Sequence, residues 1–162
     1  MTAAVTPEER LTEMGLAVPE VAKPVAAYVP AVRSGNHVYT SGQLPVRAGE
    51  LIVTGKVGGE VSAEEAYACA QQCVLNAIAA IKAEVGELSR VRRVVKVVAF
   101  VASTPDFTGQ PGVANGASEL LGQVFGEAGV HARSAVGVPV LPLDAPVEVE
   151  LLVELADPDG SA

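Results

Sequence analysis

The sequence predicts an α+β fold, in which a mixed β-sheet carries two main helices on one face. Segments rich in β-branched residues lie on both sides of two longer helical segments. Apolar residues make up 49% of the 162 residues, which suffices for a buried core in a chain of this length. No repeat or linker divides the chain, so we expect a single domain over residues 1–162, with its core over residues 28–155 and a loose tail over residues 156–162.

The N-terminal segment, residues 1–27, is expected to be an extension that contains a short helix. Thr6 can cap this helix with its hydroxyl. Pro7 suits the first helical position, because its ring fixes a helical φ and the N–H it lacks would have no partner there. Gly15 is expected to end the helix, and an extended stretch punctuated by prolines then leads through Tyr28.

Two short strands are expected before the first long helix. Residues 34–37 predict a turn, and residues 38–41 predict a strand that Gly42 ends. Residues 51–54 predict a second strand. Three glycines shortly after it indicate a flexible loop over residues 55–59.

The first long helix is expected to run from Ser62 to about Val85. Ser62 and Glu65 form a capping box at its start, and Gly86 stands at its end. One stripe of this helix should face the core. Its members are Cys69, Cys73, Ala77, Ala80 and Ile81. The two cysteines are expected to be reduced, buried and inert, because two thiols four residues apart supply at most half of a metal site.

Residues 91–102 predict a central strand. This run is apolar and β-branched apart from three cations near its start, so both of its faces should be covered. A second helix is expected over residues 113–125. Two further strands are expected over residues 134–141 and 147–155.

The acidic charge of the chain excludes several classes of function. Eleven Lys and Arg against nineteen Asp and Glu give a net charge of −8, which is poorly suited to nucleic acid or to an anionic membrane. No apolar stretch approaches the roughly 18 residues that span a bilayer. Residues 8–10 are charged where a secretory signal would be apolar. We therefore expect a cytoplasmic protein that binds neither nucleic acid nor membrane.

One cation is isolated in the acidic C-terminal part of the chain. The last 66 residues contain nine carboxylates and a single Lys or Arg, Arg133. Because side chains alternate along a strand, Arg133 shares a row with Ala135 and Gly137, while valines form the opposite row. If the valine-rich rows meet the helices, Arg133 and Glu148 lie together on the face without helices.

That face also carries small and apolar residues, and two helices cannot cover both sides of a sheet. Such a face usually buries against another subunit, so we expect a homo-oligomer. If the last two strands pair as a simple hairpin, Arg133 lies opposite Leu155 and roughly 23 Å from Glu148. The two side chains could then meet only across a subunit interface. If the two strands are not neighbours, this constraint vanishes.

A series of short segments runs in one order over residues 28–155. They are Tyr28, residues 38–45 (VYTSGQLP), residues 94–101 followed by Asp106 and Phe107, Asn115, residues 132–134 (ARS), Leu141, Pro142 and residues 147–150 (VEVE). In these segments, and in the spacing of 15 residues from Arg133 to Glu148, the chain resembles the YjgF/RidA family. Members of this family are reactive-intermediate (enamine/imine) deaminases, often labelled endoribonuclease L-PSP. The N-terminal helix and the residues around Asn115 and Arg133 resemble a longer branch of that family.

The resemblance implies a chorismate-mutase-like fold that assembles as a homotrimer with three clefts at the subunit interfaces. It also implies hydrolytic deamination of small 2-imino or enamino acids to 2-keto acids and ammonia, without a cofactor or a metal. Arg133 would clamp the carboxylate of the substrate, because a planar guanidinium holds a carboxylate bidentately. Glu148 would position or activate the attacking water.

The resemblance further implies a set of substrate-binding residues. Tyr28 and Asn115 would line the cleft, and Ser41 and the Gly42 backbone would form hydrogen bonds to the substrate. Ala135 stands where many deaminating members carry a cysteine. Its backbone can still serve the substrate, but the thiol is absent.

Other interpretations remain open on the residues alone. The same clefts could bind a small carboxylate metabolite without turnover, whereas the net charge of −8 and the lack of a histidine pair disfavour a ribonuclease. Arg133 could form a structural ion pair, Glu148 could be a solvated or interface carboxylate, and Asn115 could cap the second helix. His131 could be a base in the cleft, although a surface histidine is the simpler interpretation.

Overall fold

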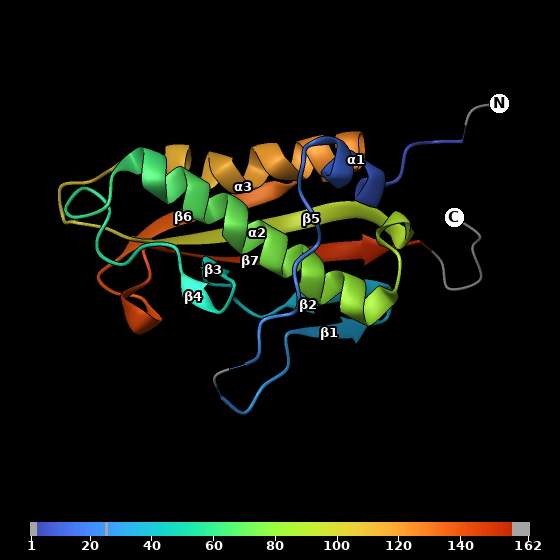
Figure 1. The fold of residues 1–162 in the computed structure, drawn as a ribbon, viewed down its shortest axis with the longest axis horizontal. Helices are drawn as coiled ribbons and strands as arrows, with labels where there is room; N and C mark the ends of the chain where they lie inside the picture. The colour runs from blue at the N-terminus through green and yellow to red at the C-terminus, as the bar shows by residue number, and fades with distance from the viewer. Residues whose placement is uncertain (1–2, 25, 157–162) are drawn as a thin grey trace.

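The computed structural model describes residues 3–24 and 26–156. In this part of the chain, three helices accompany a five-stranded mixed sheet, which confirms the α+β class (Figure 1). The helices are α1 (Pro7–Glu13), α2 (Ala63–Val85) and α3 (Gln110–Phe125). Single 3-10 turns are η1 (Leu88–Arg90), η2 (Gly126–Gly129) and η3 (Pro142–Asp144). Helices α2 and α3 cover one face of the sheet, and α1 packs against α3.

Capping hydroxyls fix the starts of α1 and α2, as predicted. Thr6 Oγ1 and Ser62 Oγ each accept a hydrogen bond of 3.1 Å from the backbone N–H three residues further on. In both helices the glutamate at that position reaches back to the N–H of the capping residue, which completes a capping box. Helix α3 begins at Gln110, three residues earlier than predicted.

The main sheet has the strand order β1-β2-β7-β5-β6. Its strands are β1 (Ala31–Ser34), β2 (His37–Thr40), β5 (Val91–Ala102), β6 (Ala132–Val138) and β7 (Val147–Leu155). Strand β5 is paired on both edges, parallel to β6 and antiparallel to β7. The sequence did not predict β1. It predicted one strand over residues 51–54, where the structure has a separate hairpin of β3 (Val46–Arg47) and β4 (Glu50–Leu51).

The hairpin expected from the last two strands is wrong, because β5 lies between β6 and β7. Helix α3 returns the chain along β5, so β6 enters parallel to β5, as a helical crossover requires. Residues 139–146 then pass around the end of β5 to its other edge, where β7 pairs antiparallel. Leu143 and Asp144 turn this connection with φ angles of 59° and 58°.

The face predicted for Arg133 is also wrong. In the β5–β6 pairing Arg133 lies beside Val97, which is fully buried beneath the helices. Arg133 therefore lies on the helix-covered face, at the edge of the sheet. Glu148 lies beside Phe100 and occupies the open face with the other glutamates of β7.

The space beneath α3 explains why β6 turns its small residues inward. A Cβ atom on Gly137 would lie 2.7 Å from Nε2 of Gln110 in α3 and 2.9 Å from Oγ of Ser103, so a larger residue there would have to displace these side chains. The row with the larger valines consequently faces outward, and Val136 is 45% exposed. Strand alternation defines two rows of side chains, but the space under the neighbouring helix decides which row is buried.

The core lies between the sheet and the two long helices. Every member of the predicted stripe of α2 is at most 2% exposed, which confirms that this stripe faces the core. On the opposite side of the sheet, Val32 and Tyr39 remain 52% and 50% exposed. None of the helices in the described residues combines the length and apolar character that crossing a membrane requires.

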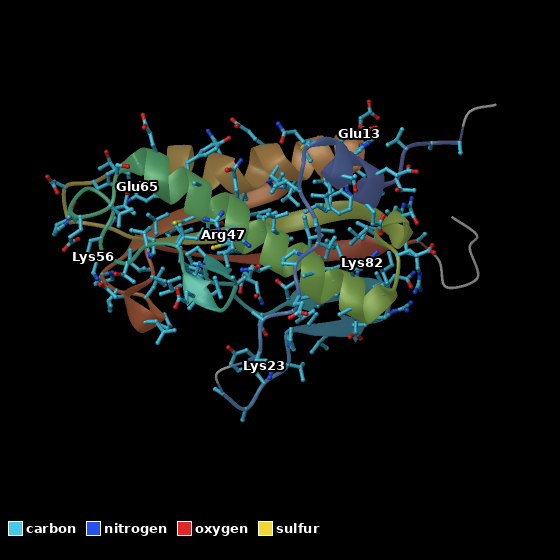
Figure 2. The ribbon with its side chains drawn as sticks, viewed as in Figure 1. Glu13, Lys23, Arg47, Lys56, Glu65 and Lys82 are labelled. Atoms are coloured by element: carbon cyan, nitrogen blue, oxygen red, sulfur yellow. The ribbon has the colours of Figure 1, made fainter. Side chains whose placement is uncertain are left out.

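Helix α1 docks the N-terminal extension onto the core. Leu11 is only 1% exposed. The Glu8 carboxylate accepts hydrogen bonds from Lys82 Nζ at 2.9 Å and from the Leu88 N–H at 2.8 Å; Figure 2 labels Lys82 on α2. Although burial opposes it, these two hydrogen bonds hold the pKa of Glu8 below its usual value. Of the tail predicted at the C-terminus, residues 157–162 lie outside the described residues.

Candidate functional site

The predicted site residues fall into two groups in the structure. The first, which we name the glutamate group, comprises Tyr28, Ser41, Gly42 and Glu148, around β2 and β7. The second, which we name the arginine group, comprises Asn115, Arg133 and Ala135, on α3 and β6. Each group is compact, but the two groups lie apart within one chain.

Close backbone contact holds the Glu148 carboxyl in the glutamate group. A Cβ atom on Gly42 would lie 2.7 Å from Cδ of Glu148, so the carboxyl packs directly on the Gly42 backbone. The neighbouring residue Gln43 forms a two-way backbone bridge with Val149 of β7, at 2.8 and 3.0 Å. This bridge fixes the Gly42 backbone relative to β7. Among the residues that the structure describes, the Gly42 N–H forms no hydrogen bond and is free for a ligand.

The environment of Glu148 alters its acidity. Burial raises the pKa of the Glu148 carboxyl above its usual value, and the negative charge of Glu150 raises it further. A carboxyl group with a raised pKa gives up and takes back a proton more readily near neutral pH. Glu148 is therefore suited to acid–base chemistry.

Tyr28 and Gly42 line one small pocket of about 80 Å³. The loop between α1 and β1 forms one wall, where Figure 2 places Lys23, and Leu143 lies on another wall. Tyr28 is 45% exposed and is not packed into the core. The pocket is lined mainly by apolar residues, with Lys23, Tyr28 and Gln43 as the residues that carry polar side-chain groups.

Ser41 fastens the strand end to the Tyr28 segment. Its Oγ donates to the Val29 carbonyl at 2.5 Å, and its N–H donates to the Pro30 carbonyl at 2.8 Å. Both donors of Ser41 are thus used within the chain. Toward a ligand, Ser41 can therefore act only as a hydrogen-bond acceptor. The resemblance implied a hydrogen bond to the substrate without giving its direction.

Arg133 is anchored on α3 in the arginine group. Its Nη1 donates to Asn115 Oδ1 at 2.8 Å and to Ser118 Oγ at 3.2 Å, and its Nη2 donates to the Pro111 carbonyl at 3.3 Å. These three acceptors lie on one face of α3, because they are spaced four and three residues apart. No carboxylate of the described residues forms a salt bridge with Arg133, so the structural ion pair considered above is absent there.

The anchoring of Arg133 leaves part of its guanidinium free. A guanidinium has five N–H groups, and the three hydrogen bonds to α3 use three of them. Both hydrogens of Nη1 are engaged, so one N–H on Nη2 and the N–H on Nε remain. Two neighbouring N–H groups can hold a carboxylate bidentately. Arg133 is therefore prepared to bind an anion with a fixed geometry.

Ala135 lies two residues beyond Arg133, on the same row of β6. It pairs with Ala99 of β5 and packs against the core. A side chain at this position is directed beneath α3 near the Arg133 anchor, and in this chain it is a methyl group. Asn115, considered above as a simple cap, instead lies inside α3 with its amide oxygen on Arg133.

One chain does not bring Arg133 and Glu148 together. Glu148 is aligned with Phe100 and, through it, with Val136, three residues along β6 from Arg133. The two residues are two strands apart across the sheet and three residues apart along it, so their Cα atoms lie roughly 14 Å apart. Their side chains point to opposite faces of the sheet. The distance of roughly 23 Å expected from a hairpin is wrong, but the two side chains are still separate.

Two further residues support the arginine group: Ser118, which the sequence did not single out, and His131, which it considered only as a base in the cleft or a surface histidine. Ser118 contacts Arg133 directly, and His131 contacts Ser118 at 2.8 Å. The available signal was the spacing of three residues between Asn115 and Ser118, which puts both on one face of a helix. No sequence pattern pairs His131 with α3, because that contact depends on the turn between α3 and β6.

The two cysteines lie on the helix side of the sheet, where the Cys73 thiol donates to the carbonyl of Val147, the neighbour of Glu148, at 3.7 Å. Burial raises the pKa of Cys69 to about 11 and holds the pKa of the fully enclosed Cys73 well above its usual value. Both cysteines are free and buried, as the sequence predicts, and their raised pKa values favour the protonated thiol. Within residues 3–24 and 26–156, no three His, Cys, Asp or Glu side chains gather into a group that could hold a metal ion.

The comparisons with known proteins agree with this fold. The family model described as "YjgF/chorismate mutase-like, putative endoribonuclease" matches residues 8–155. The solved structure of protein Atu1372 from Agrobacterium tumefaciens, described as having unknown function, matches with a TM-score of 0.87 and 46% sequence identity. That match covers 93% of this chain and 92% of the other.

Two relatives are similar over most of their length. The chain is 47% identical over 146 residues to Protein TCP17 of Trypanosoma cruzi, which covers 90% of this chain and 91% of that protein. It is 35% identical over 140 residues to the 2-iminobutanoate/2-iminopropanoate deaminase of Dermatophagoides farinae, which covers 85% of this chain and 93% of that protein. With the family model matching residues 8–155, the chain belongs to the YjgF/RidA family, as the sequence predicts.

Proposed function

We propose that this protein hydrolyses small 2-imino or enamino acids to 2-keto acids and ammonia, in clefts between copies of the chain. One observation carries the proposal. Arg133 is anchored on α3 by three hydrogen bonds and keeps two N–H groups for a carboxylate. The similarity to a 2-iminobutanoate/2-iminopropanoate deaminase supports this class of reaction.

In the proposed reaction, Arg133 holds the substrate carboxylate so that the imine carbon faces Glu148. Glu148 takes a proton from water while the water oxygen attacks that carbon, and it delivers the proton to the imine nitrogen. The product of this step is a carbinolamine. A second proton then moves from the carbinolamine hydroxyl to nitrogen, the C–N bond breaks, and ammonia leaves as the carbonyl forms. Water is the only co-reactant, so the reaction as proposed needs no cofactor.

The proposed cleft needs two copies of the chain. The glutamate group and the arginine group lie on different strands and on opposite faces of the sheet. Each copy of the chain therefore carries both halves of a site, but in two separate places. The open face of the sheet keeps Val32, Tyr39 and Val136 about half exposed. A contact that buries this face would join the arginine group of one copy to the glutamate group of the next. We propose a homotrimer with three such clefts, in keeping with closed symmetry.

A second function is favoured by one specific observation. Ala135 lies beside the Arg133 anchor where many deaminating members carry a cysteine. A site without that thiol could hold a small carboxylate metabolite without turnover. Binding of a keto acid with no turnover of an imino acid would support this alternative.

An amino-acid oxidase assay tests the proposed reaction, because the oxidase generates 2-iminobutanoate or 2-iminopropanoate in place. We expect the wild type to accelerate keto-acid formation. Glu148→Gln should lower kcat by about 100-fold or more, since it removes the proton acceptor. Arg133→Ala should raise KM and lower kcat/KM by about 100-fold, since it removes a charged pair to the substrate.

Two exposed residues provide matched controls. Arg47→Ala, beside α2, and Glu87→Gln change the same residue types outside both groups and should leave the rate unchanged. The proposal fails if wild type and Arg133→Ala both give the rate of buffer alone. It also fails if the two controls lower the rate as much as the site variants do.

A further inference from the structure

A chain of hydrogen bonds extends from Arg133 to the turn that precedes β6. Arg133 Nη1 donates to Ser118 Oγ at 3.2 Å, and Ser118 Oγ lies 2.8 Å from His131 Nε2. His131 Nδ1 lies 2.6 Å from the Gly129 carbonyl oxygen. Ser118, His131 and Arg133 are each partly buried.

The chemistry of these groups fixes the direction of each hydrogen bond. A carbonyl oxygen only accepts, so His131 Nδ1 must carry the proton on that side. In the neutral imidazole Nε2 is then the acceptor, and the Ser118 hydroxyl donates its single hydrogen to it. The lone pairs of Ser118 Oγ are left for Arg133, which can only donate. The direction of each hydrogen bond therefore sets the donor and the acceptor of the next one.

The Gly129 carbonyl is itself held in place. A Cβ atom on Gly129 would lie 2.3 Å from the Leu121 carbonyl oxygen, so the η2 turn packs its backbone directly on the end of α3. The turn and the helix thus form one rigid support. His131 is oriented by η2, Ser118 is presented by α3, and both converge on a side chain from the edge strand β6.

We propose that Ser118 and His131 are positioning residues for Arg133. They hold Nη1 so that the free N–H groups of the guanidinium keep a single orientation toward a carboxylate ligand. This inference rests on the proposed role of Arg133 in binding the substrate carboxylate. An unanchored arginine would lose rotamer freedom when it binds, and an anchored arginine has already lost it, which strengthens binding.

The tautomer of His131 tests the geometry without a ligand. Two-bond ¹H–¹⁵N correlation spectra of the wild type should show neutral His131 protonated on Nδ1. Ser118→Ala removes the donor to Nε2, so the ¹⁵N shift of Nε2 should move toward that of an imidazole nitrogen that accepts no hydrogen bond, while Nδ1 stays protonated. His37, in β2, serves as the internal comparison and should not change. Protonation of His131 on Nε2 in the neutral wild type would overturn the proposal.

Two substitutions of His131 separate positioning from simple loss of a side chain. His131→Gln keeps an acceptor near the place of Nε2, whereas His131→Asn keeps a donor near Nδ1 and loses that acceptor. Binding of 2-ketobutanoate, measured by calorimetry, should weaken about two- to tenfold in Ser118→Ala and His131→Asn. It should stay within about twofold of the wild type in His131→Gln and in the control Ser89→Ala, an exposed serine of η1. In the oxidase assay KM should follow the same order, while kcat changes little.

The outcomes distinguish this inference from the proposed function. If Arg133→Ala abolishes binding but His131→Asn binds like the wild type, the positioning role is wrong and the role of Arg133 stands. If wild type and Arg133→Ala bind 2-ketobutanoate equally weakly, both are wrong. Thermal melting of every variant identifies misfolding, and His131→Gln weakening as much as His131→Asn at an unchanged Tm would also contradict the proposal.

Discussion

The carboxyl group of Glu148 packs directly on the backbone of Gly42. The glutamate carboxyl packs where a Cβ atom would otherwise lie, so the identity of residue 42 determines the position of the proposed base. The same packing removes the carboxyl partly from water and raises its pKa. One glycine thus links backbone geometry to acid–base chemistry.

Gly42→Ala should therefore impair the proposed reaction more than it impairs the fold. The new Cβ would lie 2.7 Å from Glu148 Cδ and displace the carboxyl. Because small displacements of a reacting group are costly, kcat should fall by about 10- to 100-fold. Thermal melts of Gly42→Ala with and without Glu148→Ala give the control. The loss of stability should shrink when Glu148 is also removed, and a loss of equal size in both backgrounds would contradict the contact as its cause.

The raised pKa of Glu148 predicts the pH dependence of turnover. If the deprotonated carboxylate is the active base, kcat/KM rises with pH through a midpoint above the ordinary value of 4.5. Glu150→Gln removes a neighbouring negative charge and should move that midpoint to lower pH. For the fold the sign is opposite: protonation of Glu148 favours the folded state, so its contribution to stability decreases as pH rises through the folded-state pKa. An identical midpoint in wild type and Glu150→Gln would contradict this account.

At the scale of elements, α3 connects the core to the arginine group. Its buried face packs on α2 so closely that a Cβ atom on Gly116 would lie 2.2 Å from the Tyr67 carbonyl oxygen. Its other face presents Asn115 and Ser118 to Arg133. A shift of α3 away from α2 would therefore move the anchor of the arginine as well.

Two glycines of α3 provide a matched pair of variants. Gly116→Ala should lower the free energy of unfolding by about 1–3 kcal/mol, because backbone of α2 blocks the added methyl group. Gly112→Ala meets nothing within 4 Å and should raise it by up to about 1 kcal/mol, as alanine favours a helix. Urea unfolding measures both. Changes of the same sign in the two variants would show that close packing of α2 and α3 is not the cause.

The sequence predicts elements where their signals are local. The capping boxes, the buried stripe of α2 and the long apolar run of β5 are written in neighbouring residues, and the structure has each of them. The order of β5, β6 and β7 is not local, because it depends on where the connections after α3 and after β6 lead. The face of Arg133 was missed for a related reason, since it depends on the small space beneath α3.

The candidate site was accessible to the sequence only in part. The resemblance to a family selected Asn115 and Arg133, and the structure brings them within 2.8 Å. Ser118 stands three residues after Asn115, a spacing that puts both on one face of a helix, but no sequence pattern joins His131 to Ser118. Their contact needs the η2 turn, which sets the distance between the end of α3 and the start of β6.

At the scale of the whole molecule, the open face of the sheet is the surface that most needs an explanation. Its strands carry exposed Val32, Tyr39 and Val136 beside the row of glutamates that includes Glu148. Apolar residues on a sheet face that no helix covers are typical of a subunit interface. The proposed trimer would bury these residues and complete the site in the same contact.

Val136→Glu should prevent this assembly, because it places a charge in the proposed interface beside other carboxylates. Sedimentation velocity should show a trimer for the wild type and a monomer for the variant, and the variant should lose turnover. Val5→Glu changes an exposed valine of the N-terminal segment and should remain trimeric. A wild type that sediments as a monomer with full activity would contradict the proposed interface.

The central claim is that Arg133 of one copy and Glu148 of another form one site. The most direct test of this claim uses two inactive variants, Arg133→Ala and Glu148→Gln. The two variants are co-expressed, oligomers that contain both are isolated, and their activity is measured. Each mixed trimer contains one site in three with both residues intact, so about a third of the wild-type activity should return. If the oligomers contain both variants and no activity returns, Arg133 and Glu148 do not act together across an interface.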